Sequence, residues 1–324
     1  MLDEYYIEEL VKKKFPSKSS LIPLSVGDDC AIVNTKSTKL AVSCDSQVEG
    51  IHFNQKFMSP QEIGFRSVSI AISDLAAMGA EPKFFLNSLF IPRNTSKSFI
   101  DNLFKGFKKA CNFYKIYLIG GNVTQSKSLI IDVNVFGNVV NNKIKERLKC
   151  NVGDFIYVSG NIGDASLGLE ILKNKSRLDI KNKKLIKKYK TPIAKVNLGL
   201  FLGQLNYVTS MIDITDGLTL DLIRLIGKKS GKGANLNWDD IPKSDFILNS
   251  INPSKFTKKV MNGGDDYELM FTLKENRAKS FESLCRKKGF DVYRIGFINS
   301  SGKLSLNKGG SALKLRPDGF IHKF

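Results

Sequence analysis

The stretch PQEIGFRSVSIAISDLAAMGA (residues 60–80) has the apolar spacing of a helix, and its many small residues permit close packing against neighbouring elements. Strand-like stretches flank it: TKLAVSCD (38–45) precedes it, and FFLNSLFIP (84–92), ended by a proline, follows it. SKSFIDNLFKGFKKACNFY (96–114) then predicts a second, amphipathic helix. Strands that alternate with helices in this way indicate an α/β fold.

A second series of strands and helices follows a basic connector with few apolar residues, NNKIKERLKCNVGD (141–154). We therefore expect two domains of mixed α/β (α+β) type, an N-terminal domain of residues 1–147 and a C-terminal domain of residues 148–324. The remaining patterns predict strands at 115–121, 128–140, 154–160, 210–215, 263–273, 292–298 and 303–306, and helices at 163–172, 192–205, 216–231 and 275–288.

Composition limits the class of protein. The chain has 324 residues, of which 42% are hydrophobic and 25% charged, which is typical of a globular protein with a substantial core. The net charge of +19 favours an anionic partner: a nucleic acid, an acidic lipid or a phosphorylated metabolite. The five cysteines lie far apart and form no CxxC pair, which favours a reducing compartment.

The chain contains no apolar run of the roughly 18 residues that a membrane span needs. Its first residues, MLDEYYIEELVKKKF (1–15), predict a short charged helix rather than a signal peptide. Lysine runs such as those at 12–14 and 181–184 are more often solvated surface than binding sites. We expect a cytoplasmic protein with no membrane partner.

Because the chain is basic, its fewer acidic residues are the better guide to a functional site, and several aspartates stand beside glycines. They occur in GDD (27–29), at Asp45 and Asp74, in DITDG (213–217) and in GGDD (263–266), several of them at the ends of predicted strands. Carboxylates drawn from several segments form an oxygen-rich site that suits Mg²⁺ and substrate phosphates. Each such pair taken alone has an alternative explanation as ordinary turn chemistry. The five together favour metal and phosphate binding.

Asp213 and Asp216 lie three residues apart where a predicted strand gives way to a helix. Asp216, next to Gly217, is placed either to cap that helix or to help bind a phosphate and metal at its N-terminus. Other constellations are weak. The two histidines, His52 and His322, are too few for a histidine metal centre, and the sequence has neither a Walker A loop nor a G-x-G-x-x-G fingerprint.

Seven motifs, taken in order, resemble those of the thiamine-monophosphate kinase family, and the ending PDGFIHKF (317–324) is similar to that family's C-terminus. Single motifs are moderately specific, whereas the ordered set is highly specific. The motifs are GDDCA (27–31), SCDSQVEGIHF (43–53), SDLAAMGAEP (73–82), GGNVT (120–124), VGDFIYVSGNIGDASLGL (152–169), IDITDGL (212–218) and GGDDYEL (263–269).

The resemblance implies a homodimeric enzyme of the wider aminoimidazole-ribonucleotide-synthetase-like superfamily, with ATP bound mainly by the N-terminal domain. It implies transfer of the γ-phosphoryl group of ATP to thiamine monophosphate, giving thiamine diphosphate, with several Mg²⁺ ions. Carried over by position, the metal ligands are Asp29, Ser43, Cys44, Asp45, Asp74, Asn122, Asp213 and Asp216; the ATP contacts are Gly121, Asn122, Arg147 and Thr215; the thiamine monophosphate contacts are His52, Asp265 and Phe320.

The chain departs from the family's pattern at four of these positions. Asn122 stands where the family usually has Asp, so a metal-binding carboxylate is replaced by a neutral amide. Cys44 replaces a usual Thr with an atom poorly suited to Mg²⁺, although its backbone carbonyl remains a possible ligand. Thr215 keeps the hydroxyl of the usual Ser. Phe320 keeps the stacking face of a usual Tyr or Trp but loses the phenolic hydrogen bond.

The implied acceptor is a phosphate monoester, whose second pKa near 6 leaves it mostly ionised at pH 7. We therefore expect direct in-line transfer with no general base, no nucleophile and no phospho-enzyme, and carboxylates that only hold metal.

Three alternatives remain open. Selenophosphate synthetase normally has a reactive Cys in a Gly-rich N-terminal segment, whereas residues 1–26 have neither Cys nor Gly. The hydrogenase-maturation relative uses a C-terminal Cys, and a nucleic-acid-binding protein would explain the charge but has no recognised motif here.

Overall fold

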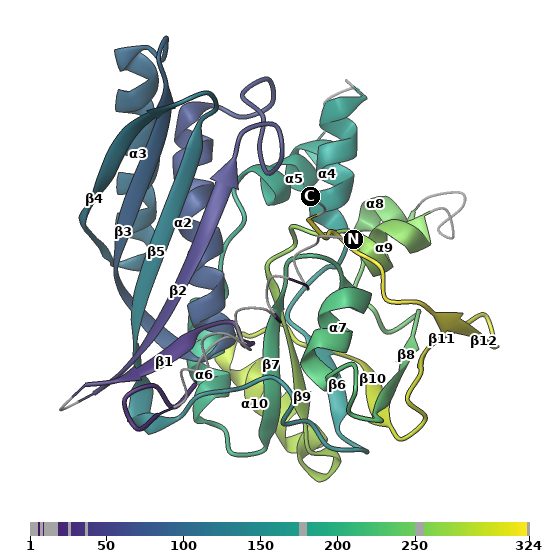
Figure 1. Cartoon of the computed structure of the whole chain (residues 1–324). Helices are drawn as coiled ribbons and strands as arrows, with labels where there is room; N and C mark the ends of the chain where they lie inside the picture. Colours follow the sequence, from purple (N-terminus) through teal and green to yellow (C-terminus); the bar gives the residue numbers. More distant parts are fainter. Residues whose placement is uncertain are drawn as a thin grey trace.

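The computed structural model describes residues 19–24, 27–35, 38–174, 180–249 and 256–322, together with the isolated residues 6 and 9. The described chain forms two sheets, with helices packed between and around them (Figure 1). The helix expected at residues 1–15 lies outside the described residues, apart from positions 6 and 9, which are helical. The lysine run at 12–14 also lies outside them.

The first sheet has five strands in the order β1-β2-β5-β3-β4. Its strand pairs are antiparallel except for β3 and β4, which run parallel at one edge. Alternate side chains of β5 are buried, because one face of the sheet packs on helices. The strands are β1 Ala31–Asn34, β2 Lys39–Val48, β3 Ala80–Pro92, β4 Tyr117–Ser126 and β5 Ile130–Val139, and the covering helices are α2 Pro60–Ala77 and α3 Lys97–Tyr114.

Helix α2 is the element around which the two sheets are arranged. Ser59 caps its first turn reciprocally with Glu62, and Pro60 occupies the first helical position, so its start is strongly encoded. The predicted close packing is confirmed: a Cβ at Gly64 would lie 2.3 Å from the carbonyl oxygen of Leu103 on α3. α2 also contacts α6 and β7 of the second half of the chain, so its buried side chains face both sheets.

The second sheet has seven strands in the order β12-β11-β8-β10-β6-β9-β7. Every residue of β9 is buried, as expected for a strand covered on both faces. The strands are β6 Phe155–Val158, β7 Val208–Ile214, β8 Gly233–Asn237, β9 Glu268–Leu273, β10 Tyr293–Asn299, β11 Leu304–Lys308 and β12 Ser311–Leu315. The helices of this half are α4 Asp164–Lys173, α5 Ile180–Lys190, α6 Val196–Gln204, α7 Leu218–Ile226, α8 Asp245–Leu248, α9 Thr257–Asn262 and α10 Ala278–Lys288, with 3₁₀ turns η1 Val140–Asn142 and η3 Glu275–Arg277.

The strands and helices predicted from sequence are present, but two have much shorter bounds than expected. The helix expected over 216–231 covers only α7, and the strand expected over 263–273 covers only β9. The physical reason is that the residues before both elements form loops, with positive φ at Gly217 and Asp265. The elements that the sequence patterns missed are short or lysine-rich: β1, α5, α8, α9, β8 and β12.

The connector between β5 and β6 is largely irregular, as its composition predicts. The domain boundary that we place between residues 147 and 148 falls within it and stays a prediction. In the expected surface run at 181–184, Lys183 and Lys184 are exposed. Within the part of the chain that the structure describes, a helix with both the length and the apolarity to cross a membrane is not found.

Candidate active site

A cavity of about 650 Å³ lies where α2 faces the ends of β2, β7 and the loop before β9. One end is acidic and the other is aromatic. The cavity gathers ten of the residues carried over by position, eight in its lining and two beside it, from segments more than 250 positions apart. These are Asp45, His52, Asp74, Arg147, Thr215, Asp216, Asp265 and Phe320 in the lining, with Asp29 and Asp213 next to Asp74 at the acidic end.

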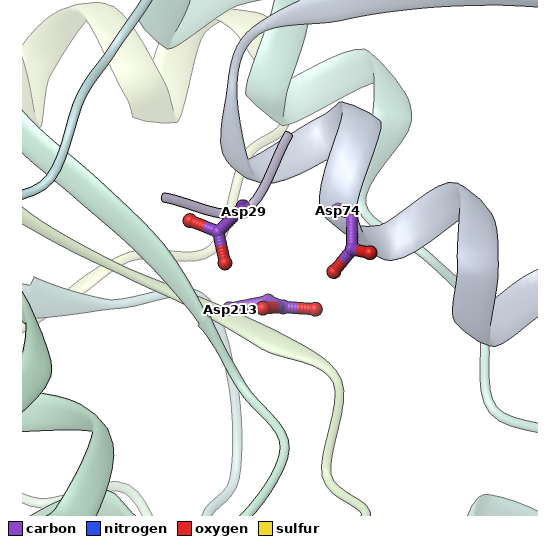
Figure 2. A group of neighbouring side chains, drawn as sticks. All are labelled: Asp29, Asp74 and Asp213. Carbon is purple, nitrogen blue, oxygen red and sulfur yellow. The ribbon is translucent and has the colours of Figure 1, made fainter. Parts of the chain in front are cut away.

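Three carboxylates converge at the acidic end (Figure 2). Asp29 comes from the segment before β1, Asp74 from α2 and Asp213 from β7, and one oxygen of each lies within 4.8 Å of the others. Asp29 and Asp213 are buried and Asp74 is half-buried. Three oxygens at this separation can ligate one divalent cation, or border two, with water or phosphate oxygens completing the shell.

The electrostatics of this end also fit a cation. Burial, reinforced by Asp45, raises the pKa of Asp74 well above its usual range, and burial with Asp29 does the same for Asp213. Burial followed by repulsion from Asp216 raises the pKa of Asp45 to about 7. One oxygen of Asp213, Oδ2, is buried with no hydrogen-bond partner among the described residues. A buried carboxylate oxygen without a donor is costly unless a cation meets it.

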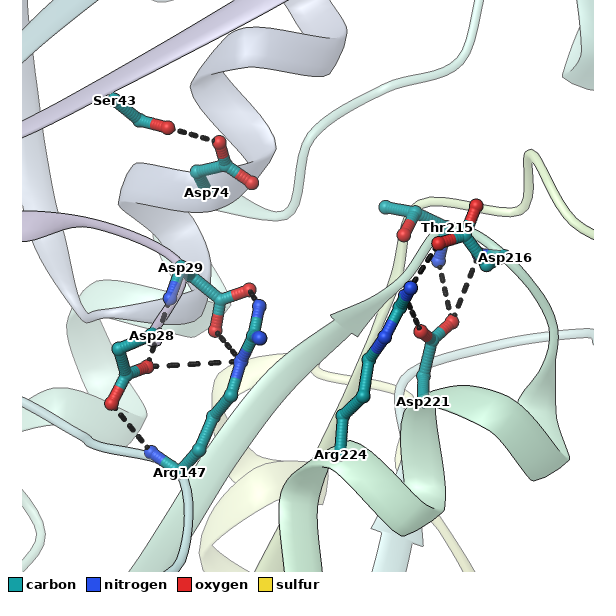
Figure 3. Close-up of polar contacts among 9 residues, drawn as sticks. All are labelled: Asp28, Asp29, Ser43, Asp74, Arg147, Thr215, Asp216, Asp221 and Arg224. Carbon is teal, nitrogen blue, oxygen red and sulfur yellow. Dashed lines mark hydrogen bonds and ion pairs between the residues drawn. The ribbon is translucent and has the colours of Figure 1, made fainter. Parts of the chain in front are cut away.

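Arg147, from the connector, joins the acidic end to the segment before β1 (Figure 3). Its Nε donates to Asp29 Oδ2 over 3.1 Å, its Nη2 donates to the other oxygen of Asp29, and its backbone N–H donates to Asp28 Oδ2 over 3.0 Å. Burial and the neighbouring Asp29 nevertheless raise the pKa of Asp28 to about 7. Arg147 lines the cavity, where its guanidinium can also meet phosphate oxygens.

The loop before α7 excludes one of the two roles left open for Asp216. The residue at the cap position is Gly217, with no side-chain capping bond, so Asp216 is not the N-cap. Asp221 Oδ2 instead accepts the backbone N–H groups of residues 215, 216 and 217 over 2.9–3.1 Å. The Asp216 carboxylate is therefore turned toward the cavity, where Arg224 of α7 donates to it and also to Asp221 (Figure 3).

The aromatic end is formed by segments from both halves of the chain. The ring of His52 lies 6.3 Å from that of Phe320 and 5.2 Å from that of His322, so the end of the chain folds back onto the loop after β2. His52 Nδ1 accepts the backbone N–H of Val48 over 3.0 Å. Burial and His322 lower the pKa of His52 to about 4. His52 is therefore neutral at pH 7 and presents a flat polar face to the cavity.

Asp265 lines the same end and is held by Arg66 of α2, whose Nη2 donates to Asp265 Oδ1 over 2.5 Å. The aromatic rings of Tyr189 and Tyr267 complete this wall. A carboxylate among aromatic rings can bind a cationic ring by charge complementarity and stacking.

Four of the residues carried over by position lie in neither the cavity lining nor the three-carboxylate cluster. Ser43 donates to Asp74 Oδ2, so its hydroxyl supports the carboxylate from behind (Figure 3). Cys44 points to the opposite face of β2, because successive side chains of a strand alternate, and its thiol meets Asp132 instead. Gly121 and Asn122 lie on the exposed edge strand β4. A Cβ at Gly121 would lie 1.8 Å from the carbonyl oxygen of Asn87, so close packing of β4 on β3 alone requires glycine there.

Sequence reasoning missed several polar residues at the cavity. Arg224 sits in an otherwise amphipathic helix, and Tyr189 lies in a lysine-rich one, where neither signals a site. Asp221 could have been found, since a carboxylate in the first turn of a helix satisfies backbone N–H groups. The missed residues include Tyr189, Arg224, Tyr267 and His322 of the lining, together with Arg66 and Asp221, which bond to lining residues.

Two family models match the chain in its two halves. The model of the AIR synthase related protein N-terminal domain matches residues 27–139, and that of the C-terminal domain matches residues 151–308. Together they cover most of the chain and correspond to the two sheets. The chain therefore belongs to the AIR synthase related family.

The similar curated proteins are more specific. The chain is 34% identical to the thiamine-monophosphate kinase of Buchnera aphidicola (subsp. Schizaphis graminum), over 98% of this chain and 99% of that protein. It is 31% identical to the thiamine-monophosphate kinase of Aquifex aeolicus, over 99% of this chain and 98% of that protein. Within the AIR synthase related family, the chain is a member of the thiamine-monophosphate kinases.

One solved structure agrees with this placement, and a second shares the fold. AaThiL complexed with AMPPCP and TMP has a TM-score of 0.85 and 29% identity, and the match covers 99% of this chain and 97% of that one. The hydrogenase maturation protein HypE of Escherichia coli has a TM-score of 0.72 at 17% identity, with 98% of each chain covered, and shares the fold.

Proposed function

We propose that this protein transfers the γ-phosphoryl group of ATP to thiamine monophosphate, giving thiamine diphosphate. The observation that carries the proposal is a single cavity with a three-carboxylate end and an aromatic, carboxylate-bearing end. Such a cavity matches two substrates of which one is a polyphosphate and the other a cationic aromatic phosphate ester. The likeness to AaThiL complexed with AMPPCP and TMP supports the same pairing.

The acidic end would hold Mg²⁺ through Asp29, Asp74 and Asp213, with Asp45 and Asp216 nearby. Mg²⁺ bound there would supply positive charge to neutralise the phosphate oxygens and help hold the reacting groups in line. The unpartnered oxygen of Asp213 supports this assignment. Ser43 orients Asp74 by its hydrogen bond, as residues behind a ligand commonly do.

Arg147 would bind phosphate oxygens of ATP while remaining anchored on Asp29, since its guanidinium has donors to spare. Thr215 offers a hydroxyl in the same part of the lining. Arg224 is a further cation of the lining, held on Asp216 and Asp221. These side chains screen the repulsion between the two anionic substrates, which is the main obstacle to transfer.

At the aromatic end, Phe320 would stack on the thiamine rings, with His52 neutral beside it and Asp265 facing their positive charge. A phosphate monoester is already ionised at pH 7, so the reaction needs no general base. We assign no residue as acid, base or nucleophile, and the transfer is direct.

We also propose a homodimer in the cytoplasm. Edge strand β4 carries exposed large apolar side chains, with Tyr117 73%, Ile119 57% and Val123 65% exposed. An apolar edge strand of this kind is covered in most soluble proteins, and a second copy of the chain would cover it. Contacts of Gly121 and Asn122 with ATP would then occur next to this interface. All five cysteines are free thiols, consistent with a reducing compartment.

The proposal is tested by ADP release from purified protein with Mg-ATP and thiamine monophosphate, followed by a coupled assay. Thiamine, pyridoxal phosphate and ribose 5-phosphate serve as controls for the acceptor. We expect ADP release to depend on thiamine monophosphate and thiamine diphosphate to form in equal amount. Equal release with no acceptor, or with thiamine, would refute the proposed function.

A further inference from the structure

We propose that Arg66 is a positioning residue for the acceptor substrate: it fixes the carboxylate of Asp265 against the thiamine end of the cavity. The inference rests on the proposed function and extends it to a residue outside the cavity lining. Arg66 lies on α2 and is 1% exposed, which is rare for an arginine unless every donor has a partner.

The guanidinium of Arg66 binds three different segments. Nε donates to Gln47 Oε1 of β2 over 3.2 Å, Nη1 donates to the carbonyl oxygen of Tyr189 at the end of α5 over 2.6 Å, and Nη2 donates to Asp265 Oδ1 over 2.5 Å. The planar fork of an arginine fixes these directions relative to one another, which a lysine cannot do.

Two aromatic rings support the same guanidinium. Its central carbon lies 5.1 Å from the centre of the Tyr189 ring and 5.8 Å from that of the Tyr267 ring. Contacts of this kind stabilise a desolvated cation. Arg66 and Gln47 belong to the N-terminal family region, whereas Tyr189, Asp265 and Tyr267 belong to the C-terminal one. Arg66 therefore sets the position of the C-terminal wall relative to α2.

Asp265 is the one partner of Arg66 whose side chain reaches the cavity with its charge. Its side chain is 30% exposed, against 2% for Arg66. The hydroxyl of Tyr267 also donates to Asp265 Oδ1, over 3.3 Å, so both donors fall on the same oxygen. Asp265 has a φ of +71°, a conformation that non-glycine residues rarely adopt without support. Arg66 thus holds an unusual loop so that the second carboxylate oxygen faces a ligand.

Helix α2 contributes to both ends of the cavity, because it carries Asp74 at the acidic end and Arg66 behind the aromatic end. The charge of Arg66 also lowers the pKa of Asp45, which burial raises, but the hydrogen bond of Arg66 to a cavity carboxylate is at the acceptor end, to Asp265. Arg66→Lys keeps that charge and changes the hydrogen-bond geometry. Displacement of the Asp265 carboxylate should therefore raise the KM for thiamine monophosphate and leave the KM for ATP largely unchanged. A purely structural role would instead lower stability and affect both substrates.

The test is a double-mutant cycle of Arg66→Lys and Asp265→Asn, with KM for each substrate, kcat and the melting temperature measured. We expect Arg66→Lys to raise the KM for thiamine monophosphate about 10²-fold, the scale of an ångström-sized misplacement, with the KM for ATP unchanged within twofold. In the Asp265→Asn background the same change should add little, because its effect passes through Asp265. Arg294→Lys, an exposed arginine stacked on Phe155, is the matched control and should change nothing.

Equal increases in both KM values, or effects that add in the double variant, would overturn the inference. If Arg66→Lys fails to fold, Tyr267→Phe removes the other donor to Oδ1, and a selective rise in the KM for thiamine monophosphate is again expected. An unchanged KM in a folded Tyr267→Phe variant would then count against the inference. A wild-type protein inactive on thiamine monophosphate would refute the proposed function instead, so the two failures are distinct.

Discussion

The Nε atom of Arg147 lies 3.1 Å from Oδ2 of Asp29, which places a cation from the connector beside one carboxylate of the three-carboxylate cluster. Asp213, in the same cluster, has an oxygen with no hydrogen-bond partner among the described residues. The cluster is therefore only partly neutralised by the protein itself. The remaining negative charge favours a bound cation and destabilises the fold when none is present.

The first prediction is that Asp213→Asn stabilises the metal-free protein while abolishing turnover. The folded-state pKa of Asp213 is raised well above its unfolded value, so the charged form costs stability increasingly as the pH rises above about 4. We expect Asp213→Asn to melt at a higher temperature than wild type, by about 2–4 °C for each kcal/mol added to the free energy of unfolding. The increase should be larger at pH 8 than at pH 5. Scanning calorimetry in the presence of EDTA measures this difference in melting temperature.

Mg²⁺ provides the second readout for the same variant. Wild-type protein should melt at a higher temperature with Mg²⁺ than with EDTA, and Asp213→Asn should lose most of that difference. Asp239→Asn, an exposed aspartate away from the cavity, is the control and should retain it. A destabilised Asp213→Asn with an intact Mg²⁺ effect would show that this carboxylate does not meet a cation.

The second prediction concerns Asn122 on β4. If this position takes part in metal binding, Asn122→Asp should lower the Mg²⁺ concentration needed for half-maximal rate, because a carboxylate binds Mg²⁺ more strongly than an amide. Titration of activity with Mg²⁺ at fixed ATP measures the shift. An unchanged Mg²⁺ curve would mean that position 122 does not contact the metal or that other residues compensate.

The third prediction is that β4 forms the dimer interface. Ile119→Lys and Val123→Lys place charges on the exposed apolar edge and should convert a dimer of twice 36.1 kDa into a monomer. Light scattering coupled to size exclusion gives the mass. Leu248→Lys, at an apolar residue 54% exposed on α8's C-terminal end, should leave the dimer intact. A dimer that survives both β4 changes would place the interface elsewhere.

The fourth prediction is a pH dependence that comes from His52. Its pKa is about 4 in the folded protein, below the unfolded value of about 6.5, so the unfolded state binds more protons between these values. Its contribution to stability is therefore unchanged above pH 6.5 and becomes unfavourable as the pH falls toward 4. The loss of stability between pH 7.5 and pH 4.5, measured by urea unfolding, should be smaller in His52→Asn than in wild type.

His322→Asn is the comparison for that experiment, since the chain has only these two histidines. Burial is the largest cause of the low pKa of His52, and repulsion from His322 is second. The variant should therefore keep most of the wild-type pH dependence. Equal losses in wild type and His52→Asn would contradict the assignment.

The order of elements and the grouping of three aspartates could be predicted because each leaves a local signal in the sequence. Asp29, Asp74 and Asp213 stand in short glycine- or strand-associated motifs, and the fold brings them within 4.8 Å. Arg66 stands in no such motif, and only its tertiary contacts with Gln47, Tyr189 and Asp265 reveal its role.

Of the two roles left open for Asp216, capping and ligand binding, the capping role was wrong for a related reason. A short polar side chain beside a helix start can either cap the helix or bind a ligand. Which of the two it does depends on whether another side chain further along the helix accepts the free backbone N–H groups. Asp221 satisfies the backbone N–H groups and releases Asp216 to face Arg224 and the cavity. The direction of the Cys44 side chain, by contrast, could have been foreseen. Successive side chains of a strand point to opposite faces of the sheet, so Cys44 faces away from Ser43 and Asp45.

The most direct test of the account is anomalous diffraction from crystals grown with Mn²⁺, a non-hydrolysable ATP analogue and thiamine monophosphate. We expect an anomalous peak at ligand distance, about 2.1 Å for a Mg²⁺-like ion, from oxygens of Asp29, Asp74 or Asp213, with a phosphate oxygen in the same shell. An analogue bound in the cavity with its metal remote from all three carboxylates would contradict it.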